Sequence, residues 1–107
     1  MTINEYQELA MRTASKGVSK QDALLNSVMG LCGESGEAIE IVKKHMFHGR
    51  ELDRDALIKE LGDVAWYIAR AADALDVPME EIFQRNIEKL QKRYPDGFVK
   101  AGGIREE

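Results

Sequence analysis

Two pairs of acidic residues, each with a spacing of three, are the side chains of this chain best placed to do chemistry. Glu34 and Glu37 lie in GESGE, and Glu60 and Asp63 lie in KELGDVAWYIA. On an α-helix, residues three apart lie about 60° from one another, so each pair would occupy one helical face. Carboxylates arranged in this way can hold a divalent cation or accept a proton from water.

Both pairs share their helical faces with apolar residues. Ile41 lies within about 20° of Glu34 and Ala38 within about 40°, and Tyr67 lies within about 20° of Glu60. A single Glu-x-x-Glu is usually a solvated helix face, because an unpaired glutamate is almost never buried. Two such pairs on the core-facing stripes of successive helices predict instead that four acidic groups meet and need a cationic partner.

The ligand set predicted for this partner contains oxygen only, which favours a hard divalent cation. Mg²⁺ fits best, because it keeps several waters and is often bound through carboxylates together with substrate phosphates; Mn²⁺ is the expected substitute. A di-iron site is the poorer interpretation, since it requires Glu-x-x-His motifs, whereas Glu37 and Asp63 stand at those third positions. His45 and His48 lie near a helix end, where histidine more often complements the helix dipole.

A row of polar side chains near the C-terminus could bind phosphate. Asn86, Lys89 and Arg93 fall on one face of a helix. The alternative is that the two cations extend over an apolar seam, but a core-facing amide at Asn86 would need hydrogen-bond partners. Together these groups suit a polyphosphate bound beside the cation. Lys44 could assist, although its simpler role is to complement a helix C-terminus.

The spacing of apolar residues predicts an all-α protein of four helices. The chain has no alternating strand pattern, internal repeat or low-complexity tract. The expected helices run from Ile3 to Ala14 after a cap at Thr2 or Asn4, from Ser19 to about His45, from a cap at Asp53 to about Asp76, and from about Pro78 to Arg93. The polar tail, about residues 98–107, is expected to be mobile.

The second expected helix carries three interior glycines, Gly30, Gly33 and Gly36. Each costs up to ~1 kcal/mol relative to alanine, so a neighbouring helix or a ligand is expected to approach this backbone closely. A 4-3-4-3-4 series on the same helix predicts a packing seam. Its members are Leu24, Val28, Leu31, Ser35, Ala38 and Val42.

Length and composition indicate a single globular domain over residues 1–107. Hydrophobic residues make up 44% and charged residues 32% of the chain, and the net charge of -4 argues against a nucleic-acid surface. No apolar run approaches the ~20 residues of a membrane span, and the N-terminus lacks a secretory signal, so a cytoplasmic location is expected. Cys32 is the only cysteine; it is expected to be a small buried residue.

These residues resemble the MazG-like all-α nucleoside triphosphate pyrophosphohydrolases, a superfamily that also contains dimeric dUTPases and phosphoribosyl-ATP pyrophosphohydrolases. The family motif is E-x-x-E followed, after a variable spacer, by E-x-x-D. It is similar to GESGE and KELGD in this chain. The segments YQELAMRT and NIEKLQKRYPDGF also resemble parts of the family, so the likeness covers most of the chain.

The resemblance implies a four-helix bundle completed by dimerisation or tetramerisation, and hydrolysis of a nucleoside triphosphate to the monophosphate and pyrophosphate. It assigns metal and catalytic roles to the four acids and phosphate contacts to Asn86 and Lys89, with Arg93 and Tyr67 as further substrate contacts. The physiological role would be removal of surplus or damaged nucleotides. Two alternatives stay open: a dUTPase-like or phosphoribosyl-ATP substrate on the same fold, and a non-catalytic helical oligomerisation module.

Overall fold

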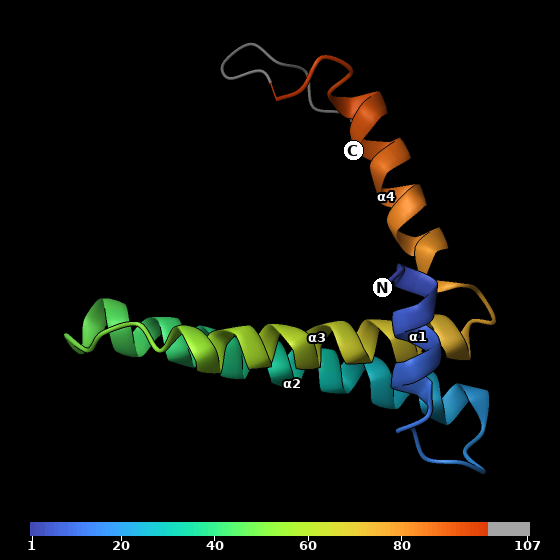
Figure 1. The fold of residues 1–107 in the computed structure, drawn as a ribbon, viewed down its shortest axis with the longest axis horizontal. Coiled ribbons are helices and arrows are strands. Elements are labelled where there is room, and N and C mark those ends of the chain that lie inside the picture. The colour runs from blue at the N-terminus through green and yellow to red at the C-terminus, as the bar shows by residue number, and fades with distance from the viewer. Residues whose placement is uncertain (99–107) are drawn as a thin grey trace.

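A computed structural model describes residues 1–98 and contains four helices in that range. They are α1 (Ile3–Met11), α2 (Lys20–Phe47), α3 (Arg54–Ala74) and α4 (Met79–Arg93) (Figure 1). Residues 1–98 contain no β-strand, so the all-α class is confirmed. No helix among them is both long and apolar enough to cross a membrane. The tail expected to be mobile lies, apart from Phe98, outside the described residues.

Local capping interactions begin three of the helices where the sequence predicts. The hydroxyl of Thr2 accepts a hydrogen bond from the backbone N–H of Glu5 at 3.0 Å, and the Glu5 carboxylate accepts one from the backbone N–H of Thr2 at 2.9 Å. The side chains of Ser19 and Asp53 accept backbone hydrogen bonds at the starts of α2 and α3. Such caps are typically worth ~1 kcal/mol each, so these starts are encoded by nearby residues.

The end of α1 depends instead on a contact with α3. The helix was predicted to reach Ala14 but ends at Met11. The backbone N–H of Thr13 donates to the carbonyl of Ala10 at 3.0 Å, and the Thr13 hydroxyl donates to the same carbonyl at 2.7 Å. The indole N–H of Trp66, on α3, donates to the Thr13 hydroxyl at 2.8 Å. A tight turn held by this indole therefore replaces the last predicted turn of helix.

Helix α2 is longer than predicted and ends at Phe47 rather than at about His45. The ring nitrogen Nδ1 of His45 lies 2.7 Å from the backbone carbonyl of Arg50 and donates to it, which holds the connection to α3 against the end of α2. This interaction gives His45 a structural role outside the acidic residues.

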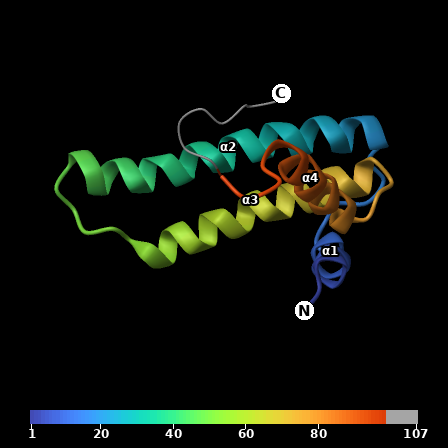
Figure 2. The same cartoon turned by 90° about the horizontal axis from the view of Figure 1, so that it is seen from above.

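The two long helices form an antiparallel hairpin that dominates the molecule (Figures 1 and 2). Helix α1 packs across α3, and α4 contacts α1 and α3, but within residues 1–98 neither contacts α2. Helix α4 rises away from the hairpin (Figure 1). The buried apolar residues lie where α1, α3 and α4 meet: Ala10, Ala69, Ala72 and Met79.

One face of α2 is apolar and uncovered by the rest of residues 1–98. We call it the outer face; it consists of Leu25, Met29, Cys32, Ile39 and Met46. Leu25, Met29, Ile39 and Met46 are between 59% and 65% exposed, and Cys32 is exposed as well. At 100° per residue these positions lie about 120–180° from the first glutamate of α2, that is, away from α3. The expectation of a buried Cys32 is therefore wrong, because no described element covers its face.

Close approach of the hairpin helices is confirmed at one of the three glycines of α2. A Cβ atom on Gly30 would overlap the ring of Tyr67 from α3, whereas a Cβ on Gly33 or Gly36 would meet nothing within 4 Å. The absence of a side chain at Gly30 thus lets Tyr67 lie directly on the α2 backbone.

Replacing Gly30 by alanine is expected to lower the free energy of unfolding by about 1–3 kcal/mol, because the added methyl group overpacks the contact with Tyr67. Gly33→Ala is the matched control. It should raise the free energy of unfolding by up to ~1 kcal/mol, through helix propensity alone. Urea denaturation of the two variants measures both effects. A gain for Gly30→Ala would show that Tyr67 does not rest on this backbone.

Candidate acidic metal site

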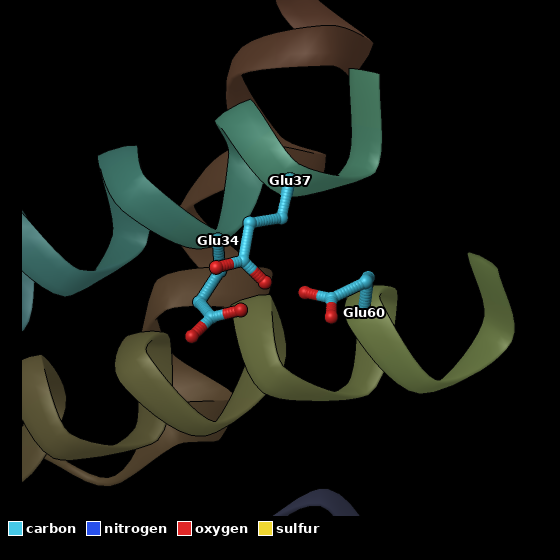
Figure 3. A group of neighbouring side chains, drawn as sticks. All are labelled: Glu34, Glu37 and Glu60. Carbon is cyan, nitrogen blue, oxygen red and sulfur yellow. The ribbon is translucent and has the colours of Figure 1, made fainter. Parts of the chain in front are cut away.

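Three glutamates from two helices point toward one another in the middle of the hairpin. Glu34 and Glu37 come from α2 and Glu60 comes from α3 (Figure 3). One carboxylate oxygen of each lies within 4.8 Å of those of the other two. This is the spacing of ligand atoms that a single divalent cation can bridge, and the three oxygens converge from two separate helices.

Within residues 1–98, no protein donor neutralises the carboxylates. Oε2 of Glu34 and Oε2 of Glu60 are buried and receive no hydrogen bond within residues 1–98. No lysine or arginine in that range forms an ion pair with any of the three glutamates. Buried oxygens without partners are unfavourable, so the chemistry of this donor set fits a hard cation.

Glu60 experiences the effect of its neighbours most strongly. The pKa of Glu60 is raised from 4.5 to about 7, first because its protonated form can donate a hydrogen bond to the Glu34 carboxylate. Burial of the half-exposed side chain and the charges of Glu37 and Glu34 raise it further. Without a cation, the cluster therefore holds a proton in its place near neutral pH.

Asp63, the fourth predicted acid, lies beside the cluster rather than within it. The group whose ligand atoms all approach within 4.8 Å does not include Asp63. Asp63 instead lines a hollow of about 290 Å³ together with Glu34, Trp66 and Tyr67. The hollow thus places one carboxylate of the cluster, one further carboxylate and two aromatic rings around the same space.

A second hollow opens on the other side of the cluster. It measures about 400 Å³, and its lining includes Glu37, Glu60, Lys44 and the open backbone at Gly33 and Gly36. The sequence predicted Lys44 as an assisting cation, and the structure brings it to this hollow. In the sequence, Gly33 and Gly36 were the only indication of this hollow, because their missing side chains leave the α2 backbone accessible.

The polar row on α4 does not join the acidic cluster within one chain. Asn86 and Lys89 are exposed, and Arg93 is half-buried. Helix α4 makes no contact with α2 in the described part of the chain, and its C-terminal end points away from the hairpin (Figure 1). The expectation that Asn86 faces the core of its own chain is therefore wrong, because α4 leaves the hairpin after its first turns.

The raised pKa of Glu60 predicts how the stability of the metal-free protein varies with pH. The folded state binds this proton more tightly than the unfolded state, whose ordinary pKa is 4.5. The stabilisation from this group is fully present below pH 4.5 and is lost as the pH rises through about 7. Thermal melts in chelator should show this decline. Glu60→Gln should flatten it, whereas Glu8→Gln, exposed on α1, should follow the wild-type profile.

Comparison with known proteins agrees with this arrangement. Residues 22–98 match the family described as the MazG nucleotide pyrophosphohydrolase domain, a range that contains all the acids of the site. The chain is also 38% identical over 114 residues to the Gene 37 protein of Mycobacterium phage L5, an alignment that covers 96% of this chain and 97% of that protein. No solved structure matches the chain. The family match covers well over half of the sequence, and the chain belongs to the MazG nucleotide pyrophosphohydrolase family.

Proposed function

We propose that the protein hydrolyses ribo- or deoxyribonucleoside triphosphates to the monophosphate and pyrophosphate in a reaction that depends on Mg²⁺. The observation that carries this proposal is the convergence of Glu34, Glu37 and Glu60, two of whose oxygens are buried and receive no hydrogen bond from residues 1–98. Membership of the family supplies the class of reaction, and the oxygen-only ligand set favours Mg²⁺, with Mn²⁺ as a substitute.

The acidic residues have two roles in this proposal: they bind the cation, and they accept a proton from the attacking water. Glu34, Glu37 and Glu60 would supply the ligand atoms. Asp63, which lines the same hollow as Glu34, would bind a second ion or orient a water molecule. Mg²⁺, when bound, neutralises charge on the phosphate oxygens. A carboxylate oxygen left free of the metal accepts a proton as the water oxygen attacks the α-phosphorus. The bond from that phosphorus to the bridging oxygen then breaks, and pyrophosphate leaves.

The two hollows beside the cluster suggest how the substrate lies. The aromatic hollow, with Trp66 and Tyr67, suits a nucleobase, because flat rings stack on flat rings. The hollow on the other side offers the ammonium of Lys44 to phosphate groups, and the missing side chains at Gly33 and Gly36 leave room for them. The acids of its lining, Glu37, Glu40 and Glu60, would require those phosphates to arrive with a cation. A triphosphate placed this way would pass directly over the cluster.

Removal of one charge from the cluster tests the catalytic proposal. Glu37→Gln and Glu60→Gln are each expected to lower pyrophosphate release by about 10²- to 10⁴-fold, because glutamine keeps the shape but cannot hold the cation or take the proton. Glu8→Gln, which changes an exposed acid on α1, should leave the rate unchanged. Steady-state assays with and without Mg²⁺, run across the ribo- and deoxyribonucleoside triphosphates, dUTP and phosphoribosyl-ATP, measure both rate and substrate class. Wild-type turnover by either cluster variant would disprove the assignment.

We further propose that the active protein is a homo-oligomer, either a dimer or a tetramer. The outer face of α2 exposes four large apolar side chains in succession, and an exposed apolar stripe of this length is typical of an interface. With Cys32 included, successive positions of this face are 4, 3, 7 and 7 residues apart. The stripe therefore follows a seven-residue repeat, which lets two helices pack along a seam. A second copy of the chain is the occupant that carries a matching face.

Oligomerisation also offers a role for the polar row on α4. Helix α4 points away from its own hairpin (Figure 1), so Asn86, Lys89 and Arg93 would reach phosphate groups in the site of a neighbouring copy. Each site would then combine acids from one chain with phosphate-binding groups from another.

Subunit mixing tests this arrangement. Lys89→Ala and Glu60→Gln should each be nearly inactive alone, but equimolar mixtures, unfolded and refolded together, should regain activity because some sites pair an intact acid cluster with an intact Lys89. A mixture of Glu37→Gln with Glu60→Gln is the control and should stay inactive, since both changes affect the same part of the site.

Light scattering at low concentration checks the oligomer directly. Ile39→Asp, which introduces a charge on the outer face, should shift the protein toward the monomer. A fully active monomer of 12.1 kDa, or an absence of rescue in the first mixture, would contradict the shared site.

A further inference from the structure

A basic hollow lies at the other end of α3 from the acidic cluster, between α3 and the connection from α1 to α2. It measures about 300 Å³. The polar side chains that line it are those of Ser15, Lys16, Lys20, Arg70 and Asp73. Three of these are cationic and one is acidic, in a chain whose net charge is -4. The side chains that line the hollow therefore carry a positive net charge, opposite in sign to that of the whole chain.

Arg70 is the residue that marks the hollow as a binding site. Only 6% of it is exposed. Its guanidinium makes one long hydrogen bond, 3.4 Å to the hydroxyl of Ser15, and lies 5.8 Å from the ring centroid of Trp66. No carboxylate within residues 1–98 forms an ion pair with it. A guanidinium carries five N–H donors, and the nitrogens of Arg70 are not among the buried side-chain atoms of residues 1–98 that lack a hydrogen-bond partner. The N–H groups that do not bond Ser15 are therefore accessible to an anion.

The backbone around the hollow adds further donors. Lys20 is the first residue of α2. In this first turn the Ser19 hydroxyl accepts from the N–H of Asp22 and the Ser19 carbonyl from the N–H of Ala23, so the N–H groups of Lys20 and Gln21 have no acceptor within the helix. The positive end of the helix dipole favours negative charge at this point. The ammonium of Lys20 is shared with Asp76, but that of Lys16 forms no ion pair within residues 1–98. Lys16 is also exposed on the loop that closes the hollow.

We propose that this hollow binds the phosphate group of a small molecule, with Arg70 as its main charged contact and Lys16 as its second. A tetrahedral oxyanion matches the donor set, because the planar guanidinium can give two parallel hydrogen bonds to two of its oxygens. The volume admits free phosphate, pyrophosphate or the phosphate end of a nucleotide. This site is separate from the acidic cluster and does not depend on the proposed hydrolysis.

Trp66 connects the hollow with the acidic side of α3. The indole lines the hollow that contains Glu34 and Asp63, and the guanidinium of Arg70 lies over the same ring. Phosphate bound to Arg70 would therefore change the surroundings of a side chain that also borders the cluster. Trp66 is the only tryptophan of the chain, so its fluorescence reports binding at this position.

The test is a titration of the whole protein with inorganic phosphate in chelator, at constant ionic strength kept with chloride. Without a divalent cation the acidic cluster repels phosphate, so binding there does not contribute. We expect a saturable change in Trp66 fluorescence and one site by calorimetry. Arg70→Met should weaken binding by at least about tenfold, because it removes the charged hydrogen-bond donors that would hold the phosphate. Arg54→Met, at the far end of α3, is the matched control and should bind as the wild type.

Further variants test the phosphate site even if Arg70→Met does not fold. Lys16→Gln changes an exposed loop residue and should also weaken binding. Wild-type affinity in a folded Arg70→Met or in Lys16→Gln, or a wild-type response no larger than that to chloride, would overturn the proposal. Glu60→Gln should bind phosphate as the wild type does, so loss of hydrolysis and loss of this site are distinguishable. Parallel titrations with pyrophosphate and a nucleoside monophosphate identify the source of the phosphate group.

Discussion

Mutual repulsion among carboxylates sets the central constraint on this hairpin. Glu34, Glu37 and Glu60 hold like charges within a few ångströms of one another between α2 and α3. Two of their oxygens are buried and have no donor in the described part of the chain. The middle of the hairpin thus opposes its own closure unless a proton or a cation is present. Packing contacts between α2 and α3 must offset this repulsion. One of them is the contact of the Tyr67 ring with the backbone of Gly30.

The distribution of side chains around α2 reflects the same constraint. Its carboxylates face α3, while large apolar side chains such as Ile39 and Met46 are exposed on the opposite side. An amphipathic surface helix of a monomer normally has the reverse arrangement, with apolar residues inward and charges outward. The proposed oligomer accounts for both the exposed apolar face and the inward carboxylates. A second copy would cover the outer face, and the acidic face would become an enclosed ligand site.

Features that depend on neighbouring residues in the sequence were predictable, and features that depend on distant contacts were not. The caps at Thr2, Ser19 and Asp53 follow from side chains that bond to backbone groups one turn away. The meeting of the glutamates follows from helical periodicity and antiparallel pairing. The early end of α1 was not predictable, since the indole of Trp66, more than fifty residues later, supplies the hydrogen bond that fixes the turn.

Other features of the structure could not be predicted from helical periodicity, for physical reasons. Periodicity places Asp63 on the face of Glu60, but whether a side chain one turn along reaches the same point depends on how two helices diverge, and here it borders an adjacent hollow. The direction of α4 depends on the turn at Asp76, which adopts a left-handed φ of 58°. Arg70 was not singled out, because only the three-dimensional structure shows that this cation is buried and forms no ion pair within residues 1–98.

The arrangement of charge along α3 bears on which form of a nucleotide the proposed site would accept. A triphosphate that carries no cation meets carboxylates on both helices and is repelled, whereas a triphosphate complexed with Mg²⁺ brings the positive charge that Glu34 and Glu60 lack. The cluster therefore discriminates through the same repulsion that destabilises the empty hairpin. At the other end of α3, the positive charge of Arg70 favours a phosphate group that has no metal cation bound to it. Helix α3 thus contributes to two proposed sites of opposite charge, with Trp66 between them. One would take a phosphate that carries a cation and the other a phosphate without one.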